Sequence, residues 1–173
     1  MKFLKQLLIG FIGLSLVIVV ISSFLPSTVR ISRGIFIHGS PAEVAAVVND
    51  LSTWKDWNPI LQDSSVKFSR TGAGELQWQN GNGIMNTMTV TQKNGDTIFV
   101  NFKLASGKNF QSGFAFHAFQ NDSLNTQADW WIIEKLKWYP WQKFYGIFAD
   151  RLKGPSLDSG LARLKEYVEI HKN

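Results

Sequence analysis

The stretch that decides the fold is residues 138–169, WYPWQKFYGIFADRLKGPSLDSGLARLKEYVE, a run with helical period near the end of the chain. Its large apolar residues recur at spacings of three and four, as on one face of an α-helix. They are Trp141, Phe144, Tyr145, Phe148 and Leu152, followed by Leu157, Leu161, Leu164 and Val168. Gly154-Pro155 is expected to kink or restart this helix, because proline removes a backbone donor. A helix with bulky rings on one face needs a large, concave, apolar partner.

The preceding sequence predicts that partner as a sheet. Alternating apolar residues indicate a strand at Thr28–His38, and Ser40-Pro41-Ala42-Glu43 is a helix start with a capping serine and an N1 proline. The helix that it starts runs to about Asn49, and a second short helix is expected at Leu51–Trp57. Six further strands follow between Gly- and Asn-rich turns, at residues 66–69, 75–79, 84–91, 97–104, 109–119 and 124–133.

Even-numbered positions in these strands share one apolar face, whereas the odd positions are more polar. The apolar set is Leu76, Trp78, Met88, Val90, Ile98, Val100, Phe102, Phe110, Phe114, Phe116, Leu124, Ala128, Trp130 and Ile132. One dry and one wet face imply an antiparallel sheet that is covered on one side. We therefore predict an α+β fold in which a curved antiparallel sheet wraps around the long C-terminal helix.

The N-terminal segment predicts a membrane anchor. Leu7–Leu25 contains no charged residue and would form a helix about 28 Å long, close to the ~30 Å hydrocarbon core of a bilayer. A cleaved signal peptide is the alternative, but its apolar region is usually only about 7–15 residues long. We expect an uncleaved anchor at residues 1–26 and one domain at residues 27–173. Lys2 and Lys5 favour a cytoplasmic N-terminus and an extracytoplasmic (periplasmic) domain, a bias that Arg30 and Arg33 weaken.

Composition excludes some functions. The 173 residues include seven Trp and thirteen Phe, which suggests a core or cavity lined with rings. There is no cysteine, so disulfide and thiolate chemistry are excluded. The formal net charge is +5, but no long basic run is present, and we expect no nucleic-acid partner.

The order of motifs along the chain resembles a known superfamily. The motifs are Leu25-Pro26, Ile35-Phe36-Ile37, Ser40-Pro41-Ala42-Glu43-Val44, Asp50-Leu51-Ser52-Thr53-Trp54, Trp57-Asn58-Pro59, Met88-Thr89-Val90-Thr91, Gly113-Phe114-Ala115-Phe116, Trp130, Tyr139-Pro140, Phe144-Tyr145-Gly146-Ile147-Phe148 and Gly160-Leu161-Ala162-Arg163-Leu164-Lys165. Together, over residues 25–170, they resemble the SRPBCC superfamily of START-like, polyketide-cyclase-like helix-grip proteins. The resemblance is closest to a bacterial branch of polyketide cyclase/dehydrase and lipid transport proteins with an N-terminal membrane span. Residues 63–79 depart from it, because they lack the Trp- and Gly-rich stretch that such proteins often carry there.

The sequence contains few groups suited to catalysis. His38, His117 and His171 lie far apart and form no metal-ligand spacing, and no Gly-x-Ser-x-Gly motif is present. The polar candidates on inward faces are Arg33, Asn86 and Thr126. We expect Arg33 to pair with an acidic residue of the helices; the alternative is that it recognises an anion. We expect no catalytic residue, no metal and no cofactor.

The resemblance implies a hydrophobic ligand held between the sheet and the C-terminal helix. The expected lining residues are Trp54, Trp78, Phe110, Phe114, Phe116, Trp130, Phe144 and Phe148. The rings either line a hollow pocket or fill a solid core. The sequence therefore predicts a membrane-anchored domain that binds a hydrophobic small molecule or lipid. The alternatives are a polyketide cyclase/dehydrase-like enzyme, and an interaction module with a filled core and an exposed patch of Trp131, Trp138 and Trp141.

Overall fold

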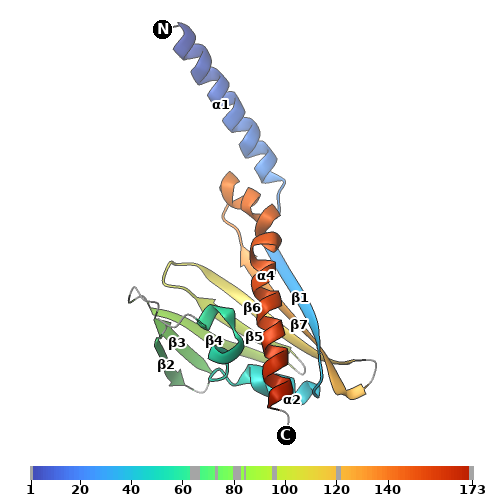
Figure 1. The fold of residues 1–173 in the computed structure, drawn as a ribbon. Coiled ribbons are helices and arrows are strands. Elements are labelled where there is room, and N and C mark those ends of the chain that lie inside the picture. The colour runs from blue at the N-terminus through green and yellow to red at the C-terminus, as the bar shows by residue number, and fades with distance from the viewer. Residues whose placement is uncertain are drawn as a thin grey trace.

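The fold is an α+β arrangement in which one long helix lies across a seven-stranded antiparallel sheet (Figure 1). The computed structural model describes residues 2–62, 67–72, 74–79, 83, 85–94, 97–119 and 122–171. The elements in chain order are α1 (Lys2–Ser23), β1 (Thr28–Ile37), α2 (Pro41–Asn49), α3 (Trp54–Trp57), the 3-10 helix η1 (Pro59–Leu61), β2 (Lys67–Gly72), β3 (Glu75–Gln79), β4 (Met85–Asn94), β5 (Thr97–Lys103), β6 (Asn109–Phe119), β7 (Asp122–Lys135) and α4 (Pro140–Ile170). This confirms the predicted helix-grip fold.

The strands lie in the order β1-β7-β6-β5-β4-β3-β2. All neighbouring pairs are antiparallel, so the sheet is a meander whose last strand, β7, pairs with the first, β1. In that pairing Thr28 lies opposite Lys135 and Ile37 opposite Thr126. The start of β1, where the chain leaves α1, therefore lies beside the end of β7, where the chain turns towards α4.

The apolar face of the sheet is as predicted at most positions. Leu124 is the clear exception, because it lies near the start of β7 and is 65% exposed. Trp131 differs in the opposite sense. The interaction-module alternative placed it in an exposed patch, but it is 8% exposed, since its indole lies against Gly113 of β6 and the Arg30 guanidinium covers it at 4.6 Å.

Local interactions explain the two short helices. In α2, Ser40 Oγ accepts a hydrogen bond from the Glu43 amide (3.3 Å), and the Glu43 carboxylate accepts one from the Ser40 amide (2.7 Å). This reciprocal cap confirms the predicted start of α2. Helix α3 begins later than predicted because the Thr53 hydroxyl donates back to the backbone oxygens of Val47 and Asp50, which holds the preceding residues in a turn.

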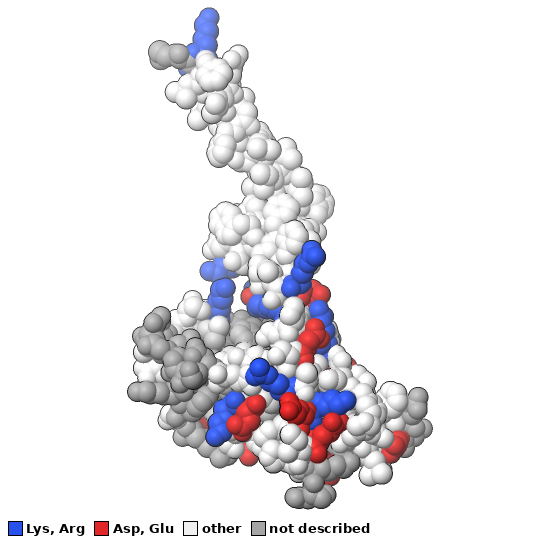
Figure 2. Space-filling model, in the orientation of Figure 1, with Lys and Arg blue, Asp and Glu red and all other residues white. Residues whose placement is uncertain are grey.

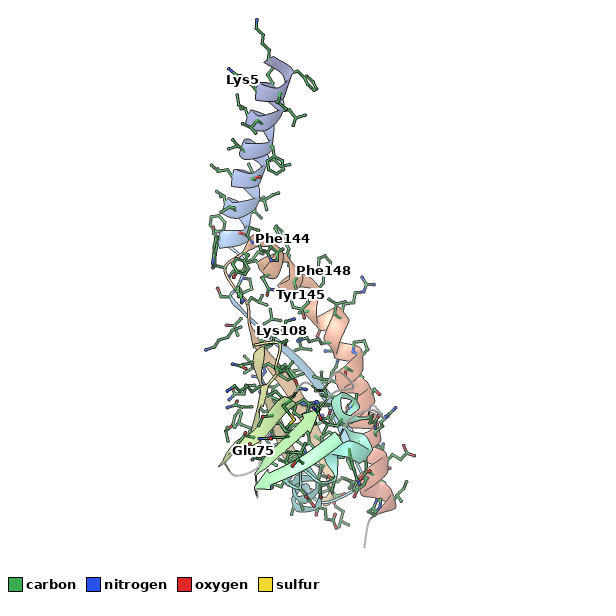
Figure 3. The ribbon with its side chains drawn as sticks, turned by 90° about the vertical axis from the view of Figure 1, so that its left-hand side faces the viewer. Lys5, Glu75, Lys108, Phe144, Tyr145 and Phe148 are labelled. Atoms are coloured by element: carbon green, nitrogen blue, oxygen red, sulfur yellow. The ribbon has the colours of Figure 1, made fainter. Side chains whose placement is uncertain are left out.

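Helix α4 is one helix of 31 residues that continues through Pro155. Its first half slants relative to its second half, so the predicted break takes the form of a bend (Figure 3). The second half packs on the sheet as predicted, through Leu157, Leu161, Leu164 and Val168.

The first half of α4 is rotated relative to our expectation. Trp141, Phe148 and Leu152 are 67%, 56% and 63% exposed, and the expectation that they face the sheet is wrong. Small residues occupy the inner side instead: Ala149 is fully buried, and a Cβ on Gly146 would come within 2.6 Å of Leu136 Cδ1. Because this side lies so close to β1 and the segment after β7, the bulky residues must point outward.

Gly160 provides a test of this close packing. A Cβ at Gly160 would overlap the ring of Trp130 and lie 2.9 Å from Pro59 Cδ. We expect Gly160→Ala to lower the free energy of unfolding by about 1–3 kcal/mol, the usual cost of overpacking a core. This loss opposes the gain of up to ~1 kcal/mol in helix propensity. Urea denaturation measures the change in the free energy of unfolding, with Ser159→Ala on the exposed side of the helix as the control. A Gly160→Ala protein that is more stable than the natural sequence would contradict the close packing.

Candidate ligand site

One end of the space between sheet and helices is filled by aromatic rings. The fully buried members are Trp54, Trp57, Trp78, Phe102, Phe114, Phe116 and Trp130, which we call the ring cluster. Phe114 stacks on Trp130 at 5.1 Å between ring centroids, and Trp54 meets Phe114 edge-on at 5.6 Å. The Trp54 indole donates to the Val48 carbonyl (2.8 Å) and the Trp130 indole to Ser112 Oγ (2.6 Å). These hydrogen bonds and ring contacts hold the described rings of this end against one another.

The residues predicted to line a cavity fall into three groups. Trp54, Trp78, Phe114, Phe116 and Trp130 all belong to the ring cluster. Phe110 lies at the edge of the cluster and is half-buried. Phe144 and Phe148 lie on α4, where Phe144 is half-buried and Phe148 points away from the sheet. The structure therefore brings six of the eight residues together, and the lining role of these six stays a prediction.

The other end of the interior is more accessible and contains an ion pair. Lys153 Nζ of α4 donates to Glu134 Oε2 of β7 at 2.6 Å, and only 14% of the Glu134 side chain is exposed. Lys153 Nζ also lies 5.6 Å from the ring centroid of Phe110, which stacks on Phe102 at 4.6 Å. A partly buried pair of charges thus lies above an apolar, aromatic floor. We call Phe110, Glu134 and Lys153 the open end of the grip.

The open end was not predicted from the sequence, although a signal for it was present. Trp130 and Ile132 were assigned to the covered face, and the same alternation places Glu134 next on it. Lys153 precedes the buried Leu157 by four residues, which places it on the inner side of α4. Charged residues are rarely buried unless they are paired. Glu134 and Lys153 are 19 positions apart, so their pairing could not be recognised from sequence spacing.

The three inward polar residues identified in the sequence each form hydrogen bonds that connect elements of the fold. Arg33 crosses from β1 to α4, where it binds both carboxylate oxygens of Asp150 (2.8 and 3.0 Å) and one of Asp158 (3.3 Å). This confirms the predicted ion pair. Thr126 Oγ1 donates to the Gly39 carbonyl at 2.6 Å, and Asn86 Oδ1 accepts from the Ala105 amide at 3.1 Å.

The ion pair with Arg33 also changes the ionisation of the Asp150 carboxyl. The hydrogen bond from Arg33 is the main cause that lowers the pKa of the Asp150 carboxyl below its usual value. Since the folded-state pKa is the lower one, the pair stabilises the fold above the pKa of an unfolded aspartate, about 3.9. That stabilisation is lost as the pH falls through the folded-state value.

We therefore expect Asp150→Asn to be less stable than the natural sequence at about pH 6, where the unfolded carboxyl is also ionised. The difference should shrink as the pH falls below about 4, because the natural pair then takes up a proton. Urea denaturation across this pH range measures it. Asp56→Asn, which changes an exposed carboxylate away from Arg33, is the control. A difference that does not depend on pH would contradict the role of the charge.

The histidines do not form a site with one another. His38 Nδ1 lies 2.9 Å from Asn125 Oδ1, His171 stacks on Tyr167 at 4.2 Å, and His117 is exposed on β6. Within the described ranges, no group of three His, Asp or Glu side chains is placed to hold a metal ion.

A groove lies on the opposite, polar face of the sheet. This open groove of about 730 Å³ crosses β4 to β7. Its lining is Thr87, Thr89, Thr91, Asn101, Phe102, Lys103, Asn109, Phe110, Gln111, Ile133 and Lys135. Most of these side chains occupy odd positions, which face away from the ring cluster. The groove therefore offers a polar alternative to the open end.

Comparison with known proteins supports the fold. No protein-family model matches the sequence, and no curated protein matches it significantly. A START superfamily protein from Mycobacterium smegmatis superimposes with a TM-score of 0.57 at 16% identity, over 81% of this chain and 97% of the other. The chain has the SRPBCC helix-grip fold.

Two aromatase/cyclase structures are similar to this SRPBCC fold as well. Zhui aromatase/cyclase from Streptomyces sp. R1128 has a TM-score of 0.57 and 14% identity, over 82% of this chain and 94% of the other. The di-domain ARO/CYC BexL of the BE-7585A biosynthetic pathway has a TM-score of 0.61 and 15% identity, over 83% of this chain and 47% of the other. The helix-grip fold predicted from the sequence is thereby confirmed.

Proposed function

We propose that this domain binds a hydrophobic small molecule or lipid at the open end of the grip, between α4 and the strands β6 and β7. The observation that carries the proposal is the Glu134–Lys153 pair beside the half-buried ring of Phe110. Ligand sites in proteins are mostly apolar with a few placed polar groups, and this end of the interior has that composition. The START-like and aromatase/cyclase proteins of the same fold support it.

The chemistry of the open end favours an amphipathic ligand. An apolar chain or ring of the ligand can lie on the Phe110 ring, which stacks on the buried ring of Phe102. Lys153 supplies hydrogen-bond donors and Glu134 supplies acceptors for a polar group at the ligand's outer end. Because the ring cluster already fills the other end, the ligand reaches only part of the way into the grip.

We also propose that α1 anchors the domain in a membrane, with the domain on the extracytoplasmic side. α1 is long and apolar enough to span a bilayer, and the rest of the protein buries none of its apolar window. A buried helix of a soluble core would be covered, so this exposure supports a span. A signal sequence would share these properties, and the topology experiment below distinguishes the two.

Retention of a ligand tests the open end. The full chain, extracted in mild detergent, is incubated with a bacterial polar lipid extract, and bound masses are read by native mass spectrometry. Phe110→Trp enlarges the ring at the open end, and we expect at least about a tenfold loss of bound lipid, equivalent to about 1.4 kcal/mol. Phe119→Trp, the same substitution at the other end of β6, is the matched control and should retain lipid.

Thr89→Trp distinguishes the open end from the groove on the polar face, which Thr89 lines. We expect it to leave lipid retention unchanged. Loss of lipid with Thr89→Trp, with or without loss with Phe110→Trp, would place the ligand in the groove, which Phe110 also borders, and overturn the proposal. Failure of the natural sequence to retain any lipid would also overturn it. Thermal melting of each variant verifies folding.

The topology can be read by cysteine labelling, since the chain has no cysteine of its own. We expect a membrane-impermeant maleimide to label Ser106→Cys, in the exposed β5–β6 turn, in intact spheroplasts. Phe3→Cys, before the span, should react only after lysis. The reverse pattern would invert the orientation, and a soluble protein that lacks residues 1–26 would identify a cleaved signal sequence.

A further inference from the structure

The first turns of α4 present a large apolar surface to the outside. Trp141, Phe148 and Leu152 follow one another at helical spacings of seven and four, over about 16 Å of helix. Ile147 is exposed beside them and Phe144 is half-buried. We call these five residues the apolar face of α4. Apolar patches of this kind on a soluble surface commonly mark a docking site.

Hydrogen bonds attach the first turn of α4, where the apolar face begins, to the short segment that follows α1. Lys143 Nζ donates to the Leu25 carbonyl at 3.1 Å and also to Ser27 Oγ, and the Leu136 amide donates to the Ser27 carbonyl at 2.8 Å. Ser22, in the last turn of α1, is 2% exposed because it packs on the domain. In Figure 3, Phe144 lies beside the end of α1, and Phe148 lies about one turn further along α4. The apolar face is therefore held within a few residues of the point where α1 ends.

Aromatic and basic residues border the apolar face. The Trp138, Tyr139 and Trp141 rings lie side by side, with centroids 5.3 and 5.0 Å apart, and Lys137 Nζ is 5.7 Å from the Tyr139 centroid. Trp and Tyr are enriched where proteins cross the membrane–water interface. Lysine stems can lie along apolar surface while the ammonium group reaches the headgroups.

Charge favours an anionic partner. Residues 130–153 contain five basic and two acidic residues, and the two acidic ones, Glu134 and Asp150, are paired with Lys153 and Arg33. Figure 2 shows the uncharged surface of α1 continuing onto the top of the domain, with basic side chains gathered just below. This is the order of apolar core and charged headgroups in a bilayer with anionic lipids.

We propose that the apolar face of α4 and the Trp138–Tyr139–Trp141 rings lie in the interfacial layer of the same bilayer that holds α1. Lys135 and Lys137 then meet anionic headgroups. The proposal rests on α1 being a membrane anchor. The bilayer is favoured over a second copy of the chain because the face is held beside the end of α1 and is flanked by basic residues, which would repel their equivalents across a symmetric dimer. Because α1 already holds the apolar face at the membrane, its docking is intramolecular. A modest favourable free energy of insertion per residue is then enough to keep it in the bilayer.

Spin labelling of single cysteines tests the depth of α4 in the full chain. The protein is reconstituted in vesicles of phosphatidylethanolamine and phosphatidylglycerol, with labels at Phe148→Cys, Leu152→Cys, Ala162→Cys or Ile12→Cys. Ala162 is the matched control, because it is exposed on the same helix but beyond the apolar face. We expect labels at 148 and 152 to be shielded from a water-soluble nickel complex and accessible to oxygen, as at Ile12. The label at 162 should show the opposite preference.

The accessibility of the labels shows whether the docking proposal fails alone or together with the membrane anchor. If Ile12 is shielded while 148 and 152 are as open to nickel as 162, the anchor stands and the docking proposal fails. If Ile12 is itself open to nickel, the anchor and the proposal that rests on it both fail. Shielding at 148 and 152 without oxygen access, together with dipolar broadening between labels, would identify a second copy of the chain as the occupant and overturn the bilayer. Circular dichroism verifies that each variant is folded.

Discussion

The close approach of α4 to strand β1 is the constraint on which the rest of the structure depends. Gly154 lets the Arg33 guanidinium lie directly against the helix, where a Cβ would overlap it. From there Arg33 reaches Asp150 and Asp158, which lie on either side of Gly154 along α4. The rotation of α4 about its own axis is thereby set. Leu157 and Leu161 then cover the ring cluster, and Phe148 and Leu152 must face outward.

Most of the fold could be predicted because its signals are local. The capping residues of α2, the Asn- and Gly-rich turns and the alternation within strands depend on neighbours in sequence, so the order of elements followed from them. The rotation of α4 could not be predicted in this way. Its first half carries an apolar stripe and, on the other side, the small residues Gly146 and Ala149. Hydrophobicity alone favoured the stripe as the buried face, whereas close backbone approach selected the small residues.

The candidate site was predicted less well, for a similar reason. The rings were correctly assigned to the covered face of the sheet, but their contacts, which fill one end of the interior, depend on side-chain geometry that spacing does not contain. The Glu134–Lys153 pair joins β7 to α4 and became visible only when both elements were placed. Trp131 shows the converse limit, because its burial depends on Gly113 of β6 and on Arg30 of β1 rather than on its own strand.

The short connection between α1 and β1, held by hydrogen bonds, has a consequence for access to the proposed ligand site. Only residues 24–27 separate the two elements, and the side chain of Lys143 and the amide of Leu136 hold two of them. With α1 in a bilayer, the domain cannot swing on a flexible tether. Because Val29 lies opposite Glu134 across β1 and β7, the open end of the grip stays at a fixed height beside the membrane surface. Under the proposed anchor and ligand site, molecules dissolved in that leaflet would reach the open end by lateral diffusion. Their encounter rate would then depend on their density per area of membrane and not on their concentration in water.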